Sequence, residues 1–152
     1  MAYNSQLWKP DQRDGKVIMF FHETKLRVRY AETDQMRYVY YGVYANYFEV
    51  ARVEALRNLG CSYKALEESG IHMPVTHYEI KYIRPAFYDE ELSIKTTIAS
   101  MPAARILFLY ETFNAKNEQL NSARTELAFL AAQTGKPVRI PQLLHHALLP
   151  YF

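Results

Sequence analysis

Two acidic residues stand close together in an irregular stretch of the sequence, directly before a segment with helical spacing. The stretch runs from Glu32 to Gly42, and Glu32 and Asp34 are its only carboxylates. A helix N-terminus offers backbone N–H groups without intrahelical acceptors and a partial positive charge. Such a terminus can stabilise an oxyanion, and a carboxylate a few residues upstream can act beside it as a base or a nucleophile. The alternative is that Asp34 only caps a turn or pairs with Arg37.

Motifs of other catalytic chemistries are missing from the sequence. There is no G-x-S-x-G elbow, Walker loop, G-x-G-x-x-G or H-E-x-x-H motif, and with 5 glycines in total a phosphate-cradling glycine loop is not expected. The five histidines show no pair with metal-ligand spacing. The single Cys61 excludes an internal disulfide framework and a cysteine zinc cluster. We therefore expect no metal site and no cofactor.

Length and composition indicate one globular domain. The chain has 152 residues, of which 49% are hydrophobic, enough for a core without disulfides. A net charge of +2 is too balanced to argue for nucleic-acid binding. The sequence has no apolar run near the ~20 residues of a membrane span and no signal-peptide pattern. We expect a cytoplasmic, single-domain protein over 1–152, with an N-terminal extension at 1–21 and a C-terminal tail at 142–152.

Hydrophobic periodicity predicts one long helix and several strands that position the acidic stretch. Alternation with a period of two indicates strands, and spacing of three to four indicates helices. Short turns between the strands predict antiparallel neighbours, and thus an α+β domain. The long helix is apolar over most of its circumference, so we expect the sheet to curl round it. The predicted strands are 25–30, 78–82, 92–98, 105–113 and 121–132, and the predicted helices are 43–59, 62–69 and 142–149.

Tyrosines are concentrated at the start of the long helix. The chain has 13 tyrosines, and five of them fall within ten residues. Tyrosine combines an apolar ring with a hydrogen-bonding hydroxyl, which suits pockets and interfaces. The concentration therefore predicts a pocket or an interface at the entrance of the helix, formed by Tyr38, Tyr40, Tyr41, Tyr44 and Tyr47.

The stretch 28–57 (VRYAETDQMRYVYYGVYANYFEVARVEALR) resembles the signature of hotdog-fold acyl-CoA thioesterases. The most similar group is the 4-hydroxybenzoyl-CoA thioesterase type, which includes the Tol-Pal-associated enzymes. Their pattern reads roughly D-x-D-x-x-G-x-V-Y-H-x-x-Y, followed by a helix with Y-x-E-x-A-R-x-E. The segments 78–90 and 135–141 fit as well, so the resemblance covers about residues 23–141.

The resemblance implies a hotdog fold, in which an antiparallel sheet of about five strands wraps one long central helix. It also implies hydrolysis of acyl-CoA or acyl carrier protein thioesters to free acid and thiol, without a cofactor. Asp34 matches the second aspartate of the motif, the family's catalytic carboxylate, which activates water or attacks the thioester carbonyl. Tyr41 matches the position that is often His, whose backbone N–H polarises that carbonyl. For Glu49, which matches a helix glutamate, we expect a structural contact.

Oligomerisation and coenzyme A binding also follow from the resemblance. Hotdog subunits form homodimers or homotetramers, with the site between two subunits. Lys136 and Arg139 follow the last predicted strand and would meet the phosphates of coenzyme A. The alternative for both residues is that they are ordinary solvated charges.

The sequence departs from the family pattern at two positions. Glu32 replaces the first aspartate, which is a mild change, and Arg37 replaces the glycine. If that glycine adopts φ > 0, a bulky replacement strains the turn by roughly 1 kcal/mol or more. Our hypothesis is that Arg37 pairs with Asp34 and keeps it ionised, or contacts the substrate.

Two other functions remain open beside hydrolysis. A hotdog protein that binds acyl thioesters without turnover would keep the pocket and lose the geometry of the loop around Arg37. A hotdog dehydratase would need a histidine and a carboxylate in a different loop, and we find no such pair in the sequence.

Overall fold

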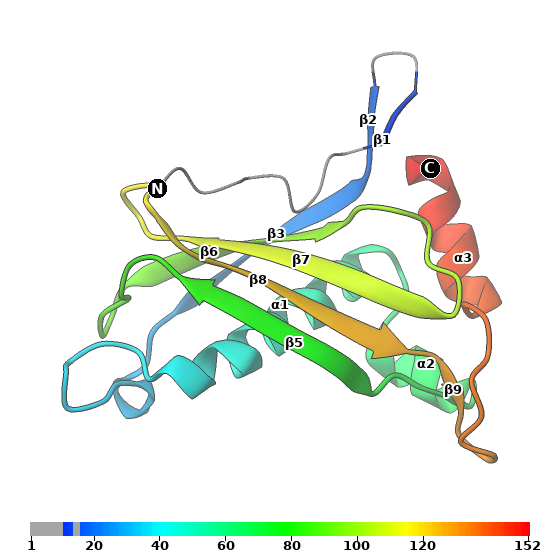
Figure 1. Cartoon of the computed structure of the whole chain (residues 1–152), viewed down its shortest axis with the longest axis horizontal. Helices are drawn as coiled ribbons and strands as arrows, with labels where there is room; N and C mark the ends of the chain where they lie inside the picture. Colours follow the sequence, from blue (N-terminus) through cyan, green and yellow to red (C-terminus); the bar gives the residue numbers. More distant parts are fainter. Residues whose placement is uncertain (1–10, 14–15) are drawn as a thin grey trace.

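A five-stranded antiparallel sheet packs against one long helix (Figure 1). The computed structural model describes residues 11–13 and 16–152. The helix is α1 (Tyr44–Asn58). This arrangement confirms the expected α+β hotdog architecture. The strands of the sheet, in spatial order, are β3 (Phe20–Arg27), β6 (Glu91–Ile98), β7 (Arg105–Phe113), β8 (Gln119–Ala128) and β5 (Val75–Tyr82).

Shorter elements complete the chain. The N-cap Ser62 accepts a 3.1 Å hydrogen bond from the Ala65 N–H at the start of the second helix, as its position in the sequence predicts. No helix in the described part of the chain is both long and apolar enough to cross a membrane. The shorter elements are β1 (Asp11–Arg13), β2 (Lys16–Ile18), η1 (Tyr30–Glu32), η2 (Tyr41–Val43), α2 (Tyr63–Glu68), β4 (Ile71–His72), β9 (Leu130–Ala131), α3 (Gln142–Leu148) and η3 (Leu149–Tyr151).

Several predicted boundaries differ from the observed ones: the strand predicted at 25–30 ends at Arg27, and the strand predicted at 78–82 begins at Val75. The first strand of the main sheet begins at Phe20, so the last two residues of the predicted extension 1–21 belong to the sheet, while residues 1–10 and 14–15 lie outside the described residues. The predicted strand 121–132 is divided into β8 and β9. Phe129 separates the two strands: its N–H donates to the Ala104 carbonyl at 3.3 Å and its side chain is fully buried.

One face of α1 forms the core with the inner face of the sheet. The ring of Phe48 stacks on that of Tyr110 in β7, with 4.5 Å between the centroids. On the opposite side of the helix, Val50 remains 46% exposed. The sheet therefore covers only one side of α1, and Val50 on the other side stays exposed within one chain. The buried residues of α1 are Tyr44, Tyr47, Phe48, Ala51, Arg52, Ala55 and Leu56.

The chain's one cysteine lies between the end of α1 and the C-terminal helix. Cys61 is fully buried and unpaired, and its Sγ–H donates to the Leu143 carbonyl of α3 at 3.4 Å. Burial raises the pKa of this thiol. Leu144 and Leu148 of α3 are also fully buried. The segment after β9 thus closes the end of the core that lies away from the start of α1 (Figure 1).

Candidate functional site

The loop that carries Asp34 is a small hairpin attached to the segment after β5. Thr33 and Val39 form an antiparallel bridge, and within it the Asp34 N–H donates to the Tyr38 carbonyl at 3.0 Å. The Val39 N–H donates to the Ala86 carbonyl at 2.8 Å, and a second bridge joins Tyr38 to Phe87. Backbone bonds therefore hold the base of this hairpin on both sides, and the tip at 34–37 projects from it.

Asp34 is half-buried at that tip. Its Oδ1 accepts a 2.8 Å hydrogen bond from the Met36 N–H, so the turn-capping role that the sequence left open is present. The same carboxylate also lines a groove at the start of α1. Capping and chemistry are therefore compatible at this residue.

Arg37 occupies the left-handed region that the motif glycine would suit. Its φ is 68° and its side chain is exposed. The Arg37 N–H donates to the Asp34 carbonyl at 2.9 Å. Within the described residues no ion pair joins the guanidinium to the Asp34 carboxylate, so the hypothesis that this pair keeps Asp34 ionised finds no support.

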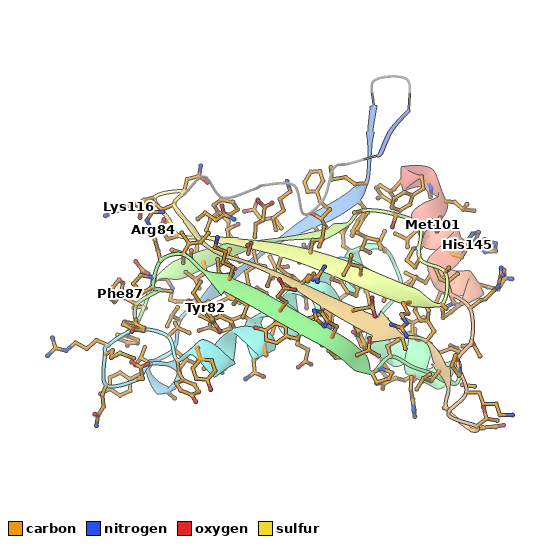
Figure 2. The ribbon with its side chains drawn as sticks, viewed as in Figure 1. Tyr82, Arg84, Phe87, Met101, Lys116 and His145 are labelled. Carbon is orange, nitrogen blue, oxygen red and sulfur yellow. The ribbon has the colours of Figure 1, made fainter. Side chains whose placement is uncertain are left out.

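The groove lies between the Asp34 hairpin, the start of α1 and the end of β5, and has a volume of about 550 Å³. Tyr82, Arg84 and Phe87 cluster at this end of the molecule, far from Met101 and His145 (Figure 2). The walls are mainly aromatic and apolar, and four of the five tyrosines predicted to form a pocket here line it, whereas Tyr47 is buried in the core. A groove of this kind suits a ligand with an apolar body.

Tyr41 places a backbone N–H at the mouth of the helix. It is the first residue of η2, which leads directly into α1, so its N–H has no intrahelical acceptor and lies at the positive end of the helix dipole. The Tyr82 hydroxyl donates to the Tyr41 carbonyl at 2.9 Å and so anchors this turn to β5. Tyr41 and Asp34 both line the groove, so the structure brings the two predicted residues together.

The phenols of Tyr44 and Tyr82 remain protonated near neutral pH. Burial, followed by the proximity of Tyr82, raises the pKa of Tyr44 to about 12. Burial also raises the pKa of Tyr82. These hydroxyls can therefore donate hydrogen bonds but are not available as bases. Among the residues that line the groove, Asp34 is the only carboxylate.

Glu32 lies next to this loop but faces the protein interior. Only 9% of its surface is exposed, and its carboxylate accepts hydrogen bonds from the Arg29 N–H, the Arg29 side chain and the Tyr47 hydroxyl. Burial alone would raise the pKa of Glu32, but the bonds from Tyr47 and Arg29 outweigh it and hold the pKa below its ordinary value. The sequence analysis treated Glu32 only as a mild change in the motif. The i, i+3 spacing of Arg29 and Glu32 was the available signal for this local contact.

Lys136 and Arg139 lie at the other end of the molecule from Asp34. Both are exposed and follow β9, which pairs with β4 beyond the C-terminal end of α1. The 15 residues of α1 span about 22 Å. One chain therefore does not bring these cations to the Asp34 groove (Figure 1). Glu49 is exposed on α1, where its charge contributes to a raised pKa of Tyr63, whose main cause is burial.

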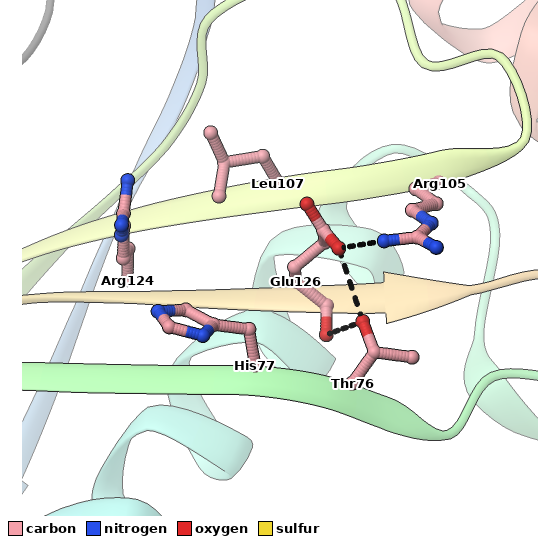
Figure 3. Close-up of a pocket in the computed structure, with 6 residues that line it drawn as sticks. All are labelled: Thr76, His77, Arg105, Leu107, Arg124 and Glu126. Atoms are coloured by element: carbon pink, nitrogen blue, oxygen red, sulfur yellow. Dashed lines mark hydrogen bonds and ion pairs between the residues drawn. The ribbon is translucent and has the colours of Figure 1, made fainter.

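A second hollow lies on the outer face of the sheet, over β5, β7 and β8 (Figure 3). Glu126 accepts from Arg105 at 2.6 Å and from the Thr76 hydroxyl at 3.1 Å, and Arg124 donates to Glu79 at 3.0 Å. These charges already satisfy one another, so the hollow lacks a free reactive group. In the described part of the chain, no cluster of three or more His, Cys, Asp or Glu side chains could hold a metal ion.

Comparisons with known proteins identify the family of this chain. The family model described as "Thioesterase-like superfamily" matches residues 28–148. Acyl-CoA thioester hydrolase YbgC of Escherichia coli O157:H7 is 32% identical over 77% of this chain and 87% of its own length. The chloroplastic acyl-acyl carrier protein thioesterase ATL3 of Arabidopsis thaliana is 31% identical over 86% of this chain and 69% of its own length.

The solved structures include a similar enzyme as well. The DHNA-CoA thioesterase of Staphylococcus aureus superposes with a TM-score of 0.81 at 37% identity, and the match covers 86% of this chain and 89% of that one. The sheet and helix, the aromatic groove and the carboxylate beside the helix start thus occur in a chain whose sequence and structure both match thioesterases. This chain belongs to the thioesterase-like superfamily.

Proposed function

We propose that this protein hydrolyses acyl thioesters of coenzyme A or of acyl carrier protein to a free acid and a thiol. The observation that carries the proposal is that Asp34 and Tyr41, the first residue of the turn that leads into α1, line the same apolar groove. The named relatives support both carriers, because one acts on acyl-CoA and another on acyl carrier protein thioesters.

The proposed reaction uses only these two groups. The thioester carbonyl oxygen accepts a hydrogen bond from the Tyr41 N–H, which stabilises the oxyanion of the tetrahedral intermediate. Asp34 takes a proton from a water molecule as that water attacks the carbonyl carbon. The C–S bond then breaks, and the leaving sulfur receives the proton from Asp34. In the alternative route the Asp34 carboxylate attacks the carbonyl carbon, and the C–S bond breaks to release the thiolate. Water then hydrolyses the resulting anhydride to the free acid and the Asp34 carboxylate, and the proton that this step releases goes to the thiolate.

The two routes differ in where oxygen from water first enters. In a single turnover in ¹⁸O water, the base route places the label in the product acid alone. The nucleophile route allows label to enter the Asp34 side chain when water attacks the anhydride at that carboxyl. Mass spectrometry of the peptide that contains Asp34 therefore distinguishes the two routes.

A second subunit would complete the groove. Within the described residues one edge of β5 has no strand partner, and Val75, Tyr78 and Tyr82 along it are 47%, 37% and 46% exposed. An uncovered edge with apolar side chains is suited to pairing with another strand. We therefore infer a homodimer, alone or within a homotetramer, in which two β5 strands pair antiparallel about a two-fold axis.

This pairing would also give Lys136 and Arg139 a role. Strand β5 runs from the β4–β9 end of the molecule to the groove, since Val75 follows β4 and Tyr82 lines the groove. Antiparallel pairing brings the Val75 end of one subunit to the Tyr82 end of the other. The turn with Lys136 and Arg139 of the second subunit would then lie on the side of the Asp34 groove of the first, where its charges could meet the phosphates of the carrier.

The test is release of free thiol from acyl-CoA and acyl carrier protein thioesters of graded chain length. We expect turnover by the wild type and a loss of about 10²- to 10⁴-fold in kcat for Asp34→Asn, because the amide cannot accept the proton. Glu118→Gln, at the exposed turn after β7, is the matched control and should retain full activity. Full activity of Asp34→Asn would remove Asp34 from the mechanism.

The rival function is acyl-thioester binding without turnover, and the strained Arg37 in the loop is the observation that favours it. Absence of turnover by the wild type on every thioester, combined with calorimetric binding of acyl-CoA, would establish that reading instead of hydrolysis.

A further inference from the structure

Glu32 joins the Asp34 hairpin to the first turn of α1 through its hydrogen bond with Tyr47. We propose that Glu32 is a positioning residue, which through Tyr47 fixes the distance between the Asp34 carboxylate and the Tyr41 N–H. The inference rests on the proposed function, because it concerns the two groups to which that function assigns the reaction.

The side chain of Glu32 provides the first anchor. Its Oε2 accepts a 2.6 Å hydrogen bond from the buried Tyr47 hydroxyl and a 2.8 Å bond from the Arg29 N–H. Its Oε1 accepts from the Arg29 guanidinium at 2.7 and 2.8 Å. Tyr47 is 4% exposed and belongs to the first turn of α1. A charge-assisted bond of this length in a buried site ties the hairpin firmly to the helix.

The backbone of Glu32 provides the second anchor. Its carbonyl accepts a 3.0 Å hydrogen bond from the Tyr40 N–H. The chain therefore leaves Glu32 towards Asp34, two residues later, and returns to Glu32 at the residue that precedes Tyr41. Besides the bonds to Ala86 and Phe87 that hold the base of the hairpin, Glu32 thus contacts both the strand that leads to Asp34 and the residue that precedes Tyr41.

Glu32 does not itself have the features of the reacting carboxylate. All of its donors come from the scaffold, it does not line the groove, and its pKa is lowered rather than matched to proton transfer near neutrality. Asp34 in the same loop differs from it in place, because it is half-buried and lines the groove. The two carboxylates therefore divide the work between positioning and chemistry.

The test compares Tyr47→Phe, Glu32→Gln and Glu32→Ala with the wild type. Tyr47→Phe removes only the hydroxyl and keeps the ring in the core. Glu32→Gln keeps an oxygen that can accept from both Tyr47 and the Arg29 N–H. Tyr151→Phe, which removes an exposed hydroxyl at the far end of the chain, is the matched control. Activity is measured at a temperature at which circular dichroism shows every variant to be folded.

We expect Tyr47→Phe and Glu32→Ala to lower kcat by about 10- to 100-fold, as displacement of reacting groups by about 1 Å does, with KM changed less than about 3-fold. We expect Glu32→Gln to retain kcat within about 3-fold, because its amide oxygen still accepts the hydrogen bond from Tyr47 although the negative charge is lost. Hydrogen exchange of the Tyr40 N–H, which reports the hairpin without any turnover, should accelerate about 10-fold or more in Tyr47→Phe.

Other results would overturn the inference. If folded Tyr47→Phe has the kcat of the wild type, Glu32 has only a structural role, even where the melting temperature falls. If Tyr40 exchange is unchanged, the anchor does not hold the hairpin. Asp34→Asn in the same series separates the two claims, since its full activity would refute the proposed reaction while the exchange data still decide the role of Glu32.

Discussion

Arg37 adopts a backbone conformation that L side chains disfavour, in the loop that carries Asp34. Its φ is 68°, and a Cβ in this region costs about 1–2 kcal/mol. Glycine avoids this cost because it has no Cβ. We therefore expect Arg37→Gly to be more stable than Arg37→Ala, since both variants lose the same guanidinium and only alanine retains the strain.

The net effect is smaller than the strain itself. Glycine has more freedom than alanine in the unfolded chain, which opposes its gain by about 0.4–1 kcal/mol. The remainder favours glycine at position 37 by about 0.5–1 kcal/mol. For a domain of about this length, 1 kcal/mol corresponds to about 2–4 °C, so the midpoint for Arg37→Gly should lie about 1–4 °C above that for Arg37→Ala.

The assay is thermal and urea unfolding of both variants, followed by circular dichroism. Arg57, exposed in the last turn of α1, supplies the matched control. At an ordinary helical position the order reverses, and Arg57→Gly should be less stable than Arg57→Ala by about 0.5–1 kcal/mol. The reasoning is refuted if Arg37→Gly is no more stable than Arg37→Ala while the Arg57 pair behaves as expected.

The same Arg37 variants also test contact with the substrate. If the guanidinium binds substrate, both variants should raise KM in the thiol-release assay by a similar factor. An unchanged KM in both would leave Arg37 without a role in binding.

Three further predictions follow from the buried and hydrogen-bonded groups. The pKa of Glu32 is lower in the folded state than its unfolded-state value of about 4.3. Its contribution to stability is therefore complete above that unfolded-state pKa and is lost as the pH falls through the folded-state pKa. The free energy of unfolding, measured with urea, should fall more between pH 5 and pH 3 in the wild type than in Glu32→Gln. Thr112→Val should raise the free energy of unfolding, by up to about 1–3 kcal/mol, because the buried Thr112 hydroxyl has no hydrogen-bond partner in the described part of the chain. Tyr82→Phe should lower kcat/KM by about 2- to 10-fold, because the Tyr41 carbonyl loses its 2.9 Å hydrogen bond.

Each of these predictions has a matched control. Tyr151→Phe, which removes no carboxyl group, should leave the loss of stability between pH 5 and pH 3 as in the wild type. Thr125→Val should destabilise the protein, because the buried Thr125 hydroxyl shares a 2.7 Å hydrogen bond with Tyr110; destabilisation by Thr112→Val as well would show that its hydroxyl is satisfied. Tyr151→Phe should leave kcat/KM unchanged, and a wild-type value for Tyr82→Phe would contradict the role of that bond.

Local patterns were enough to predict the elements that build the site. The almost wholly apolar run over 105–113 matches β7 residue for residue, and the helical spacing over 43–59 matches α1 to within one residue at each end. The motif glycine at position 37 suggested a positive φ as one of two possibilities, and Arg37 adopts it. These features depend on neighbours in the sequence, which is why periodicity and motif spacing find them.

The contacts that organise the site depend on the tertiary fold. Tyr47 and Glu32 are 15 residues apart in the sequence, and nothing in their local context predicts that the hydroxyl and the carboxylate meet. The anchor from Tyr82 to Tyr41 spans 41 residues. The positions of Lys136 and Arg139 relative to the groove depend on the pairing of two chains, which one sequence does not specify.

The burial of Cys61 gives the protein an intrinsic reporter of local opening. The thiol lies beneath α3, bonded to the Leu143 carbonyl, and its raised pKa keeps the reactive thiolate scarce. An alkylating reagent can therefore reach it only after the C-terminal helix has lifted from the end of α1. Because the chain has one cysteine, the labelling rate measures how often that end of the core opens, independently of any event at the groove.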